Sequence, residues 1–148
     1  MTQEIPKLIQ ILLIEDSPSD AKLTITALKD AKVTNQLCHV EDGVLAMDFL
    51  RRKGEFSNAP RPDLILLDLN LPRKDGREVL KEIKEDPEFM HIPVVVLTTS
   101  QADQDILRSY QLHANCFITK PVNFEKFLQV IRAIENFWLT VVSLPIKS

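Results

Sequence analysis

The chain has 148 residues, a formal net charge of −3 and a hydrophobic fraction of 45%. This length suits one domain with a well-buried core and is short for two. Lysine and arginine are interspersed with acidic residues and no basic block stands out, which argues against a nucleic-acid-binding protein.

The sequence carries no pattern of a targeting or membrane segment. The first residues lack the charged and then apolar order of a signal peptide, and no apolar run approaches the roughly 18 residues that a membrane span needs. Cys38 and Cys116 lie far apart and form no C-x-x-C pair, so we interpret both as reduced core residues. These features predict a soluble, cytoplasmic protein.

Apolar runs typical of strands alternate with amphipathic segments typical of helices along the chain. Ser17-Pro18 follows the first run and places an N-cap residue before a proline at the first helical position, which indicates a helix start. Gly76 and Pro87 bracket the third helical segment, and Asn123 is the expected cap of the last one. The expected strands are 8–14, 36–40, 64–67, 92–97 and 116–119, and the later helices include 44–50, 103–111 and 123–137.

Continuous apolar strands separated by amphipathic helices imply a parallel sheet covered on both faces, as in a doubly wound α/β protein. In such sheets the functional side chains gather at the carboxyl ends of the strands. Polar residues stand at four of those ends, namely Glu15 with Asp16, then Asp68, Thr98 and Lys120. We therefore expect these side chains to form one site.

Three carboxylates at one edge of a sheet repel one another unless a cation lies between them, and an oxygen-rich site with few protein ligands suits Mg²⁺. A carboxylate such as Asp68 can attack phosphorus and form an aspartyl phosphate. Thr98 and Lys120 would then neutralise the oxygens of the transferred group. Each residue alone has an ordinary structural explanation, but their combination at four strand ends favours phosphoryl transfer.

These residues belong to a wider pattern that resembles the receiver domain of two-component response regulators. The resemblance spans roughly residues 8–137 and implies a flavodoxin-like (βα)5 sandwich with a five-stranded parallel sheet of order 2-1-3-4-5. It rests on Glu15-Asp16, on Asp68 followed by Leu71-Pro72 and Asp75-Gly76, on Thr98 after an apolar strand, and on Lys120-Pro121.

The resemblance implies a metal site around a phosphoacceptor. Asp68 resembles the phosphorylated aspartate, which also binds the metal, Asp16 a direct Mg²⁺ ligand, and Glu15 a ligand that acts through water. The backbone carbonyl of Asn70 resembles a further protein ligand. Asn70 and Ser100 also occupy positions that tune the access of the hydrolytic water.

The same resemblance implies a switch. Thr98 resembles the hydroxyl that moves toward the phosphoryl group, and Lys120 resembles the lysine that contacts it. Phe117 stands where the family has an aromatic residue that turns inward, although plain strand packing explains it equally well. A cis bond before Pro121 would aim Lys120 into the site.

A narrower resemblance concerns the partner. The stretches HIPVVVLTTS and ENFWLTVVSLP are similar to stand-alone regulators of cyanobacterial phytochromes, which implies a light-sensing histidine kinase. We expect a single receiver domain over 1–148, with its core at 8–137, an apolar tail at 138–148 and no output domain. The family implies a dimer through the fourth helix, fifth strand and fifth helix. The tail either folds back on the last helix or covers a partner.

Three other functions compete with this one. A phosphorelay intermediate would pass its phosphoryl group on to a histidine phosphotransfer protein. An aspartate-nucleophile phosphohydrolase needs a second acid two residues after the nucleophile, and Asn70 cannot supply that proton. A pseudo-receiver that no longer reacts is disfavoured by the joint presence of Asp68, Thr98 and Lys120. We expect a signalling protein that is not an enzyme and catalyses only its own phosphorylation and dephosphorylation.

Overall fold

The computed structural model describes residues 9–30, 35–98, 116–120, 122–123, 125–126 and 129. The strands are β1 (Ile9–Ile14), β2 (Asn35–Val40), β3 (Leu64–Asp68), β4 (Val94–Thr98) and β5 (Cys116–Thr119). The helices are α1 (Pro18–Asp30), α2 (Gly43–Leu50) and α3 (Gly76–Glu85), with a short 3-10 turn η1 (Gly54–Phe56). The expected helix at 103–111, most of the one at 123–137 and the tail at 138–148 lie outside the described residues.

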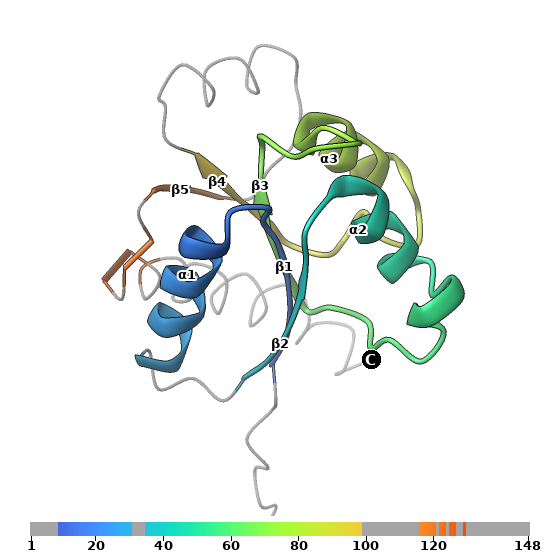
Figure 1. The fold of residues 1–148 in the computed structure, drawn as a ribbon. Helices are drawn as coiled ribbons and strands as arrows, with labels where there is room; N and C mark the ends of the chain where they lie inside the picture. Colours follow the sequence, from blue (N-terminus) through green and yellow to red (C-terminus); the bar gives the residue numbers. More distant parts are fainter. Residues whose placement is uncertain are drawn as a thin grey trace, which may run out of the picture.

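The five strands form one parallel sheet in the order β2-β1-β3-β4-β5 (Figure 1). This order confirms the predicted flavodoxin-like α/β architecture. Ile14 at the end of β1 lies opposite Val40 on β2 and Leu67 on β3, and Asp68 lies opposite Leu97 on β4. The carboxyl ends of the strands therefore meet at one edge, and the strand order reverses between β1 and β3, where doubly wound sheets bind ligands.

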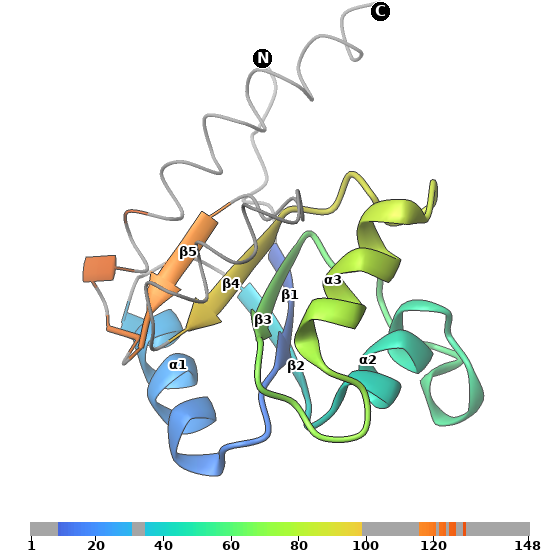
Figure 2. The ribbon, with the colours of Figure 1, turned by 90° about the horizontal axis from the view of Figure 1, so that it is seen from above.

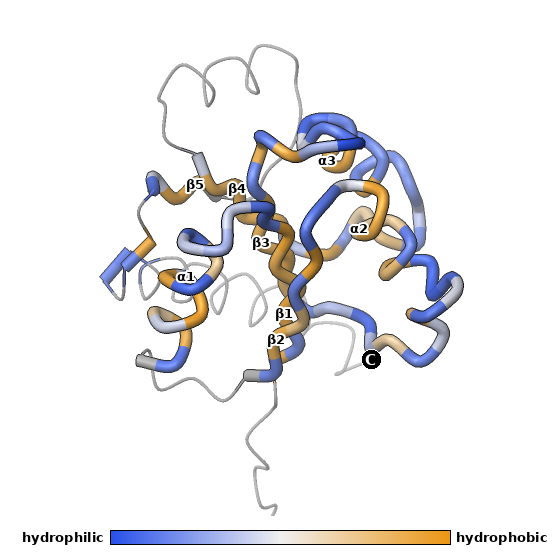
Figure 3. The backbone as a smooth tube through the Cα atoms, viewed as in Figure 1, coloured by the Kyte–Doolittle hydropathy of each residue, from blue (hydrophilic) through white to orange (hydrophobic). Residues whose placement is uncertain are grey.

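The central strands β1, β3 and β4 send side chains alternately to the two faces of the sheet, and nearly all of these side chains are buried. Leu12 and Ile14 of β1 belong to the core cluster under α2 and α3, whereas Ile11 and Leu13 belong to the cluster under α1. Figure 2 shows α1 on one face of the sheet and α2 with α3 on the other, and Figure 3 shows how hydrophobic the strands are. Each buried leucine or isoleucine contributes about 1.5–3 kcal/mol, so burial of the strands stabilises the sheet that carries the site.

The helix α3 presents one apolar stripe to the sheet. Val79, Leu80 and Ile83 are 0% exposed, as their helical spacing predicts. Asp75 caps the helix because its carboxylate accepts a hydrogen bond of 2.7 Å from the backbone N–H of Arg77. The start of α3, which directly follows the loop after Asp68, is thus fixed by the sequence itself.

The buried face of α1 differs from the one that the sequence predicts. The apolar spacing places Leu23 on one stripe with Ala27 and Leu28, but Leu23 is 48% exposed. The stripe instead runs through Ala21, Thr24 and Leu28, positions three and four residues apart that lie above one another on a helix. Leu23 stands about 100° away from Thr24 around the helix and so falls outside this stripe.

The fourth strand begins two residues later than predicted, at Val94. Pro93 has no backbone N–H to donate to the ladder, although its carbonyl accepts a hydrogen bond of 3.0 Å from the N–H of Ile65. Among the described residues, no helix is long and apolar enough to cross a membrane.

Candidate functional site

The carboxyl edge of the sheet gathers the acids that the sequence places at strand ends. Glu15 follows β1 and is 0% exposed, Asp68 ends β3 and is 4% exposed, and Asp16 is exposed at the surface. One carboxylate oxygen from each of the three lies within 4.8 Å of the others. The structure thus brings together three of the predicted metal-site residues, two of them inside the protein.

Burial and mutual repulsion shape the charges of this cluster. Burial and, after it, the neighbouring Asp68 carboxyl raise the pKa of Glu15 from 4.5 to about 7, against the opposing effect of Lys120. Burial alone would lower the pKa of Lys120, but its close ion pair with Glu15 and the charge of Asp68 outweigh burial and raise it. The ammonium therefore stays charged, but it does not keep the pKa of Glu15 at its ordinary value.

Lys120 reaches the centre of the cluster from the end of β5. Its backbone N–H donates a hydrogen bond of 2.8 Å to the carbonyl of Thr98, which holds it against β4. The Nζ atom lies 2.8 Å from Oε2 of Glu15 and 3.3 Å from Oδ2 of Asp68, and the side chain is 11% exposed. A lysine at this strand end was predicted, and the structure places its charge between the two buried acids.

Lys120 has a third partner that sequence reasoning missed. Its Nζ atom lies 3.1 Å from Oδ2 of Asp20, a residue in the first turn of α1. The two residues are 100 positions apart in the chain, so no local pattern joins them. The available signal was the acid three residues after the N-cap serine Ser17, a position that ordinarily suggests only helix capping.

The loop after Asp68 is held close to the strand end. The N–H of Asn70 donates a hydrogen bond of 3.2 Å to Oδ1 of Asp68, and the N–H of Gly76 donates one of 3.0 Å to the carbonyl of Leu69. A Cβ atom on Gly76 would lie 2.6 Å from Cα of Leu69 and would also overlap the carbonyl oxygen of Asp68. Glycine is therefore needed at this position so that α3 can start directly beneath the loop.

The predicted switch residues lie at the same edge or next to it. Thr98 ends β4 at 2% exposure, one strand away from Asp68 in the sheet. Phe117 lies opposite Val96 and is a half-buried residue packed against the core cluster under α2 and α3. Ser100 and Pro121 lie outside the described residues, and so does the predicted cis bond.

The donor set suits a hard divalent cation. The cluster offers carboxylate oxygens and no nitrogen or sulfur, which favours Mg²⁺, Mn²⁺ or Ca²⁺ over softer metals. Two buried acids beside one ammonium leave net negative charge that such a cation would offset. The residues present therefore fit a divalent metal at this strand edge.

The fold and this edge define a class of protein. Residues 11–132 match the family model of the response regulator receiver domain, so the chain belongs to that family. The match favours phosphorylation-based signalling and does not favour a phosphohydrolase.

The chain is also similar to particular members of the family. It is 52% identical to the response regulator Rcp1 of Synechocystis over 135 residues, which cover 91% of this chain and 92% of that protein. The crystal structure of the phosphorylated cyanobacterial phytochrome response regulator RcpA has a TM-score of 0.74 at 53% identity, covering 90% and 95% of the two chains. The Mn²⁺-bound form of Rcp1 has a TM-score of 0.72 at 50% identity, covering 90% and 96%.

Proposed function

We propose that Asp68 accepts a phosphoryl group from a histidine kinase. The observation that carries the proposal is the buried carboxylate of Asp68, whose Oδ2 lies 3.3 Å from Lys120 Nζ in a cluster with Glu15 and Asp16. One Asp68 oxygen forms a bond to phosphorus, and the bond from phosphorus to the imidazole nitrogen of the kinase breaks with its electron pair going to that nitrogen. The products are an aspartyl phosphate and a neutral histidine on the kinase.

We assign the cation that this reaction needs as Mg²⁺. Glu15, Asp16, Asp68 and the backbone carbonyl of Asn70 would hold it, and when bound it offsets the charge of the phosphoryl oxygens. Lys120, which follows the outer strand β5, supplies a second positive charge at the same edge of the sheet. The similarity to Rcp1, which has been crystallised in a Mn²⁺-bound form, supports a divalent metal here.

Phosphorylation then acts through residues beside the site. Thr98 moves toward the phosphoryl group and Phe117 turns inward, which biases the surface near β5 between two states. Asn70 and Ser100 set how readily water reaches the phosphoryl group. The output is a contact with another protein, and the chain acts as a signalling component that catalyses only its own phosphorylation and dephosphorylation.

The kinase that fits this chain best is a phytochrome. The similarity to Rcp1 and RcpA supports this assignment, because RcpA is a phytochrome response regulator.

A dimer through the fourth helix, fifth strand and fifth helix is also part of the proposal. Light scattering with and without beryllofluoride tests it, and a monomer at high micromolar concentration in both states contradicts it.

The assignment of Asp68 is tested by replacing it, with a replacement of the acid at the other end of the same strand as the control. Asp68→Asn should accept no label from radioactive acetyl phosphate or from an autophosphorylated phytochrome kinase. Asp63→Asn, a change just before β3, should accept it at the level of the unmodified protein. Labelling of Asp68→Asn at that level would contradict the proposal. Transfer onward to a histidine phosphotransfer protein would show a relay in place of a terminal regulator.

A further inference from the structure

The carboxylate of Asp20 is turned away from the role that its position suggests. Ser17 caps α1, because its Oγ accepts a hydrogen bond of 3.3 Å from the N–H of Asp20. An acid three residues after such a cap ordinarily reaches back to the N–H of the cap residue. Here the Ser17 N–H donates to Oε1 of Glu15 at 3.2 Å, and the Asp20 carboxylate instead contacts Lys120 at 3.1 Å.

This contact differs in kind from the other two contacts of the ammonium. Nζ of Lys120 lies 2.8, 3.1 and 3.3 Å from carboxylates of Glu15, Asp20 and Asp68. Among the described residues only the contact with Asp20 has the geometry of a hydrogen bond, whereas those with Glu15 and Asp68 are ion pairs and Oε2 of Glu15 has no hydrogen-bond partner. Asp20 therefore competes with a phosphoryl oxygen on Asp68 for the N–H donors of Lys120.

The two acids that remain beside Lys120 after phosphorylation differ in what their release costs. Asp68 is then an aspartyl phosphate and no longer a carboxylate, so the comparison is between Glu15, whose side chain is 0% exposed, and Asp20, whose side chain is 37% exposed. A buried carboxylate that loses its ammonium is left as an uncompensated charge, while one in contact with water is resolvated. Asp20 is thus the partner that leaves at least cost.

We propose that Asp20 is a positioning residue that holds Lys120 before phosphorylation and releases it to the phosphoryl oxygen afterwards. Release frees a charged side chain in the first turn of α1, so the state of Asp68 is communicated to that helix. The inference rests on the proposed function, because it takes Asp68 as the phosphoacceptor.

The test measures the affinity for beryllofluoride, an inorganic mimic of the phosphoryl group, at saturating Mg²⁺. Asp20→Asn keeps the shape of the side chain and removes the competing charge, so it should bind the mimic about five-fold more tightly, the equivalent of about 1 kcal/mol for a partly exposed ion pair. Asp20→Glu keeps the charge and should restore the original affinity. Glu41→Gln, a change at an exposed acid just after β2, controls for the loss of one negative charge near this edge.

A second measurement follows the exchange directly in the unmodified protein. The side-chain carboxyl carbon of Asp20 should shift in the NMR spectrum when beryllofluoride binds, and urea unfolding confirms that the variants are folded. An unchanged or weaker affinity of Asp20→Asn, an equal gain in Glu41→Gln, or an unmoved Asp20 carboxyl signal would overturn the inference. If the unmodified protein binds no beryllofluoride, the proposed function itself fails.

Discussion

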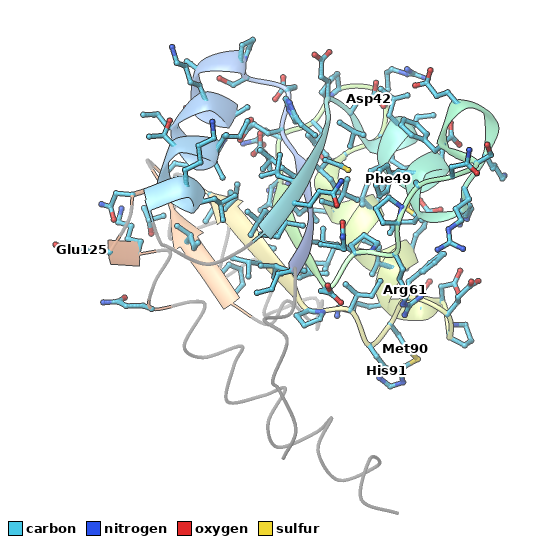
Figure 4. All side chains as sticks on the ribbon, turned by 90° about the horizontal axis from the view of Figure 1, so that it is seen from below. Asp42, Phe49, Arg61, Met90, His91 and Glu125 are labelled. Atoms are coloured by element: carbon cyan, nitrogen blue, oxygen red, sulfur yellow. The ribbon has the colours of Figure 1, made fainter. Side chains whose placement is uncertain are left out.

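Two aspartates lie at the two ends of the strand β3, and different groups surround their carboxylates. Asp63 precedes the strand, where its Oδ2 accepts a hydrogen bond of 2.9 Å from the N–H of Gln10, and its own N–H donates one of 2.7 Å to the Gln10 carbonyl. Asp68 ends the strand among other carboxylates. Figure 4 shows the two ends of the molecule, with Asp42 near the carboxyl edge and Arg61 near the amino edge.

The difference follows from the direction of the backbone. The amino ends of parallel strands present N–H groups that lack a partner, so a carboxylate there is stabilised by the backbone itself. The carboxyl ends present carbonyl oxygens, which repel a carboxylate, so an acid there needs donors from the segment that follows the strand. Asp68 has one such donor, the N–H of Asn70, and its remaining stabilisation comes from the ammonium of Lys120. This dependence on a cation makes Asp68 responsive to a ligand.

The largest expected effect comes from the loop that fixes the carboxyl edge. Gly76→Ala should lower the free energy of unfolding by about 3 kcal/mol, because the added Cβ would overlap backbone atoms of Asp68 and Leu69. Gly54→Ala is the matched control: Gly54 has a φ of 57° but open space around it, so the change should cost only about 1 kcal/mol. Equal losses in urea unfolding would contradict this account.

A smaller effect should appear in the pH dependence of the free energy of unfolding, which acids at the two ends of β3 should influence differently. The pKa of Glu15 is raised to about 7 in the folded protein, so the metal-free fold binds more protons than the unfolded chain between pH 4.5 and 7. The contribution of Glu15 to stability is thus largest below pH 4.5 and is lost as the pH rises to 7, a difference on the order of 2–3 kcal/mol.

Glu15→Gln removes this dependence and keeps the volume of the side chain. In urea unfolding with a chelator, we expect the variant to match the unmodified protein at pH 5 and to exceed it in stability at pH 8. Asp63→Asn serves as the control at the amino edge and should show no such divergence. A variant that is less stable at pH 8 than the unmodified protein would contradict the predicted direction.

The sequence predicted those parts of the site that depend on local patterns. Asp68 and Thr98 follow apolar runs whose length and composition indicate buried strands, and parallel pairing alone brings such ends to one edge. Asp20 was missed because its partner is 100 residues away and its spacing is that of an ordinary helix cap. Leu23 was misassigned because apolar residues at the margin of a helix stripe cannot be told from core residues by spacing alone.

A further part was beyond prediction because it depends on the backbone conformation of loops. Arg73, in the loop after Asp68, has a φ of 66°, and its guanidinium lies 3.0 Å from Asp42, the acid that caps α2 by accepting a hydrogen bond of 2.8 Å from Leu45. Nothing in the sequence marks an arginine for a left-handed conformation, which favours glycine. The contact fixes this loop to the start of α2.

The smallest expected effects come from replacing Arg73 and Arg52, two arginines that share the left-handed backbone conformation. Arg52 has a φ of 55° and follows the end of α2, where the N–H of Lys53 donates a hydrogen bond of 2.9 Å to the carbonyl of Asp48. This is the helix-ending turn in which glycine is favoured. Arg52→Gly also loses the exposed hydrogen bond of 2.9 Å from Nε to the carbonyl of Ala59, which offsets part of the gain. The variant should therefore raise the free energy of unfolding by about 0.5 kcal/mol and leave phosphorylation unchanged.

Arg73→Gly relieves the same strain but removes the ion pair with Asp42, whose side chain is only 9% exposed. The two contributions oppose each other, so we expect a change in stability within about 0.5 kcal/mol of zero. The loop after Asp68 loses its link to α2, and the rate of labelling by acetyl phosphate should fall, in contrast to Arg52→Gly. A stabilisation of Arg73→Gly equal to that of Arg52→Gly, with unchanged labelling, would show that the ion pair does not hold the loop.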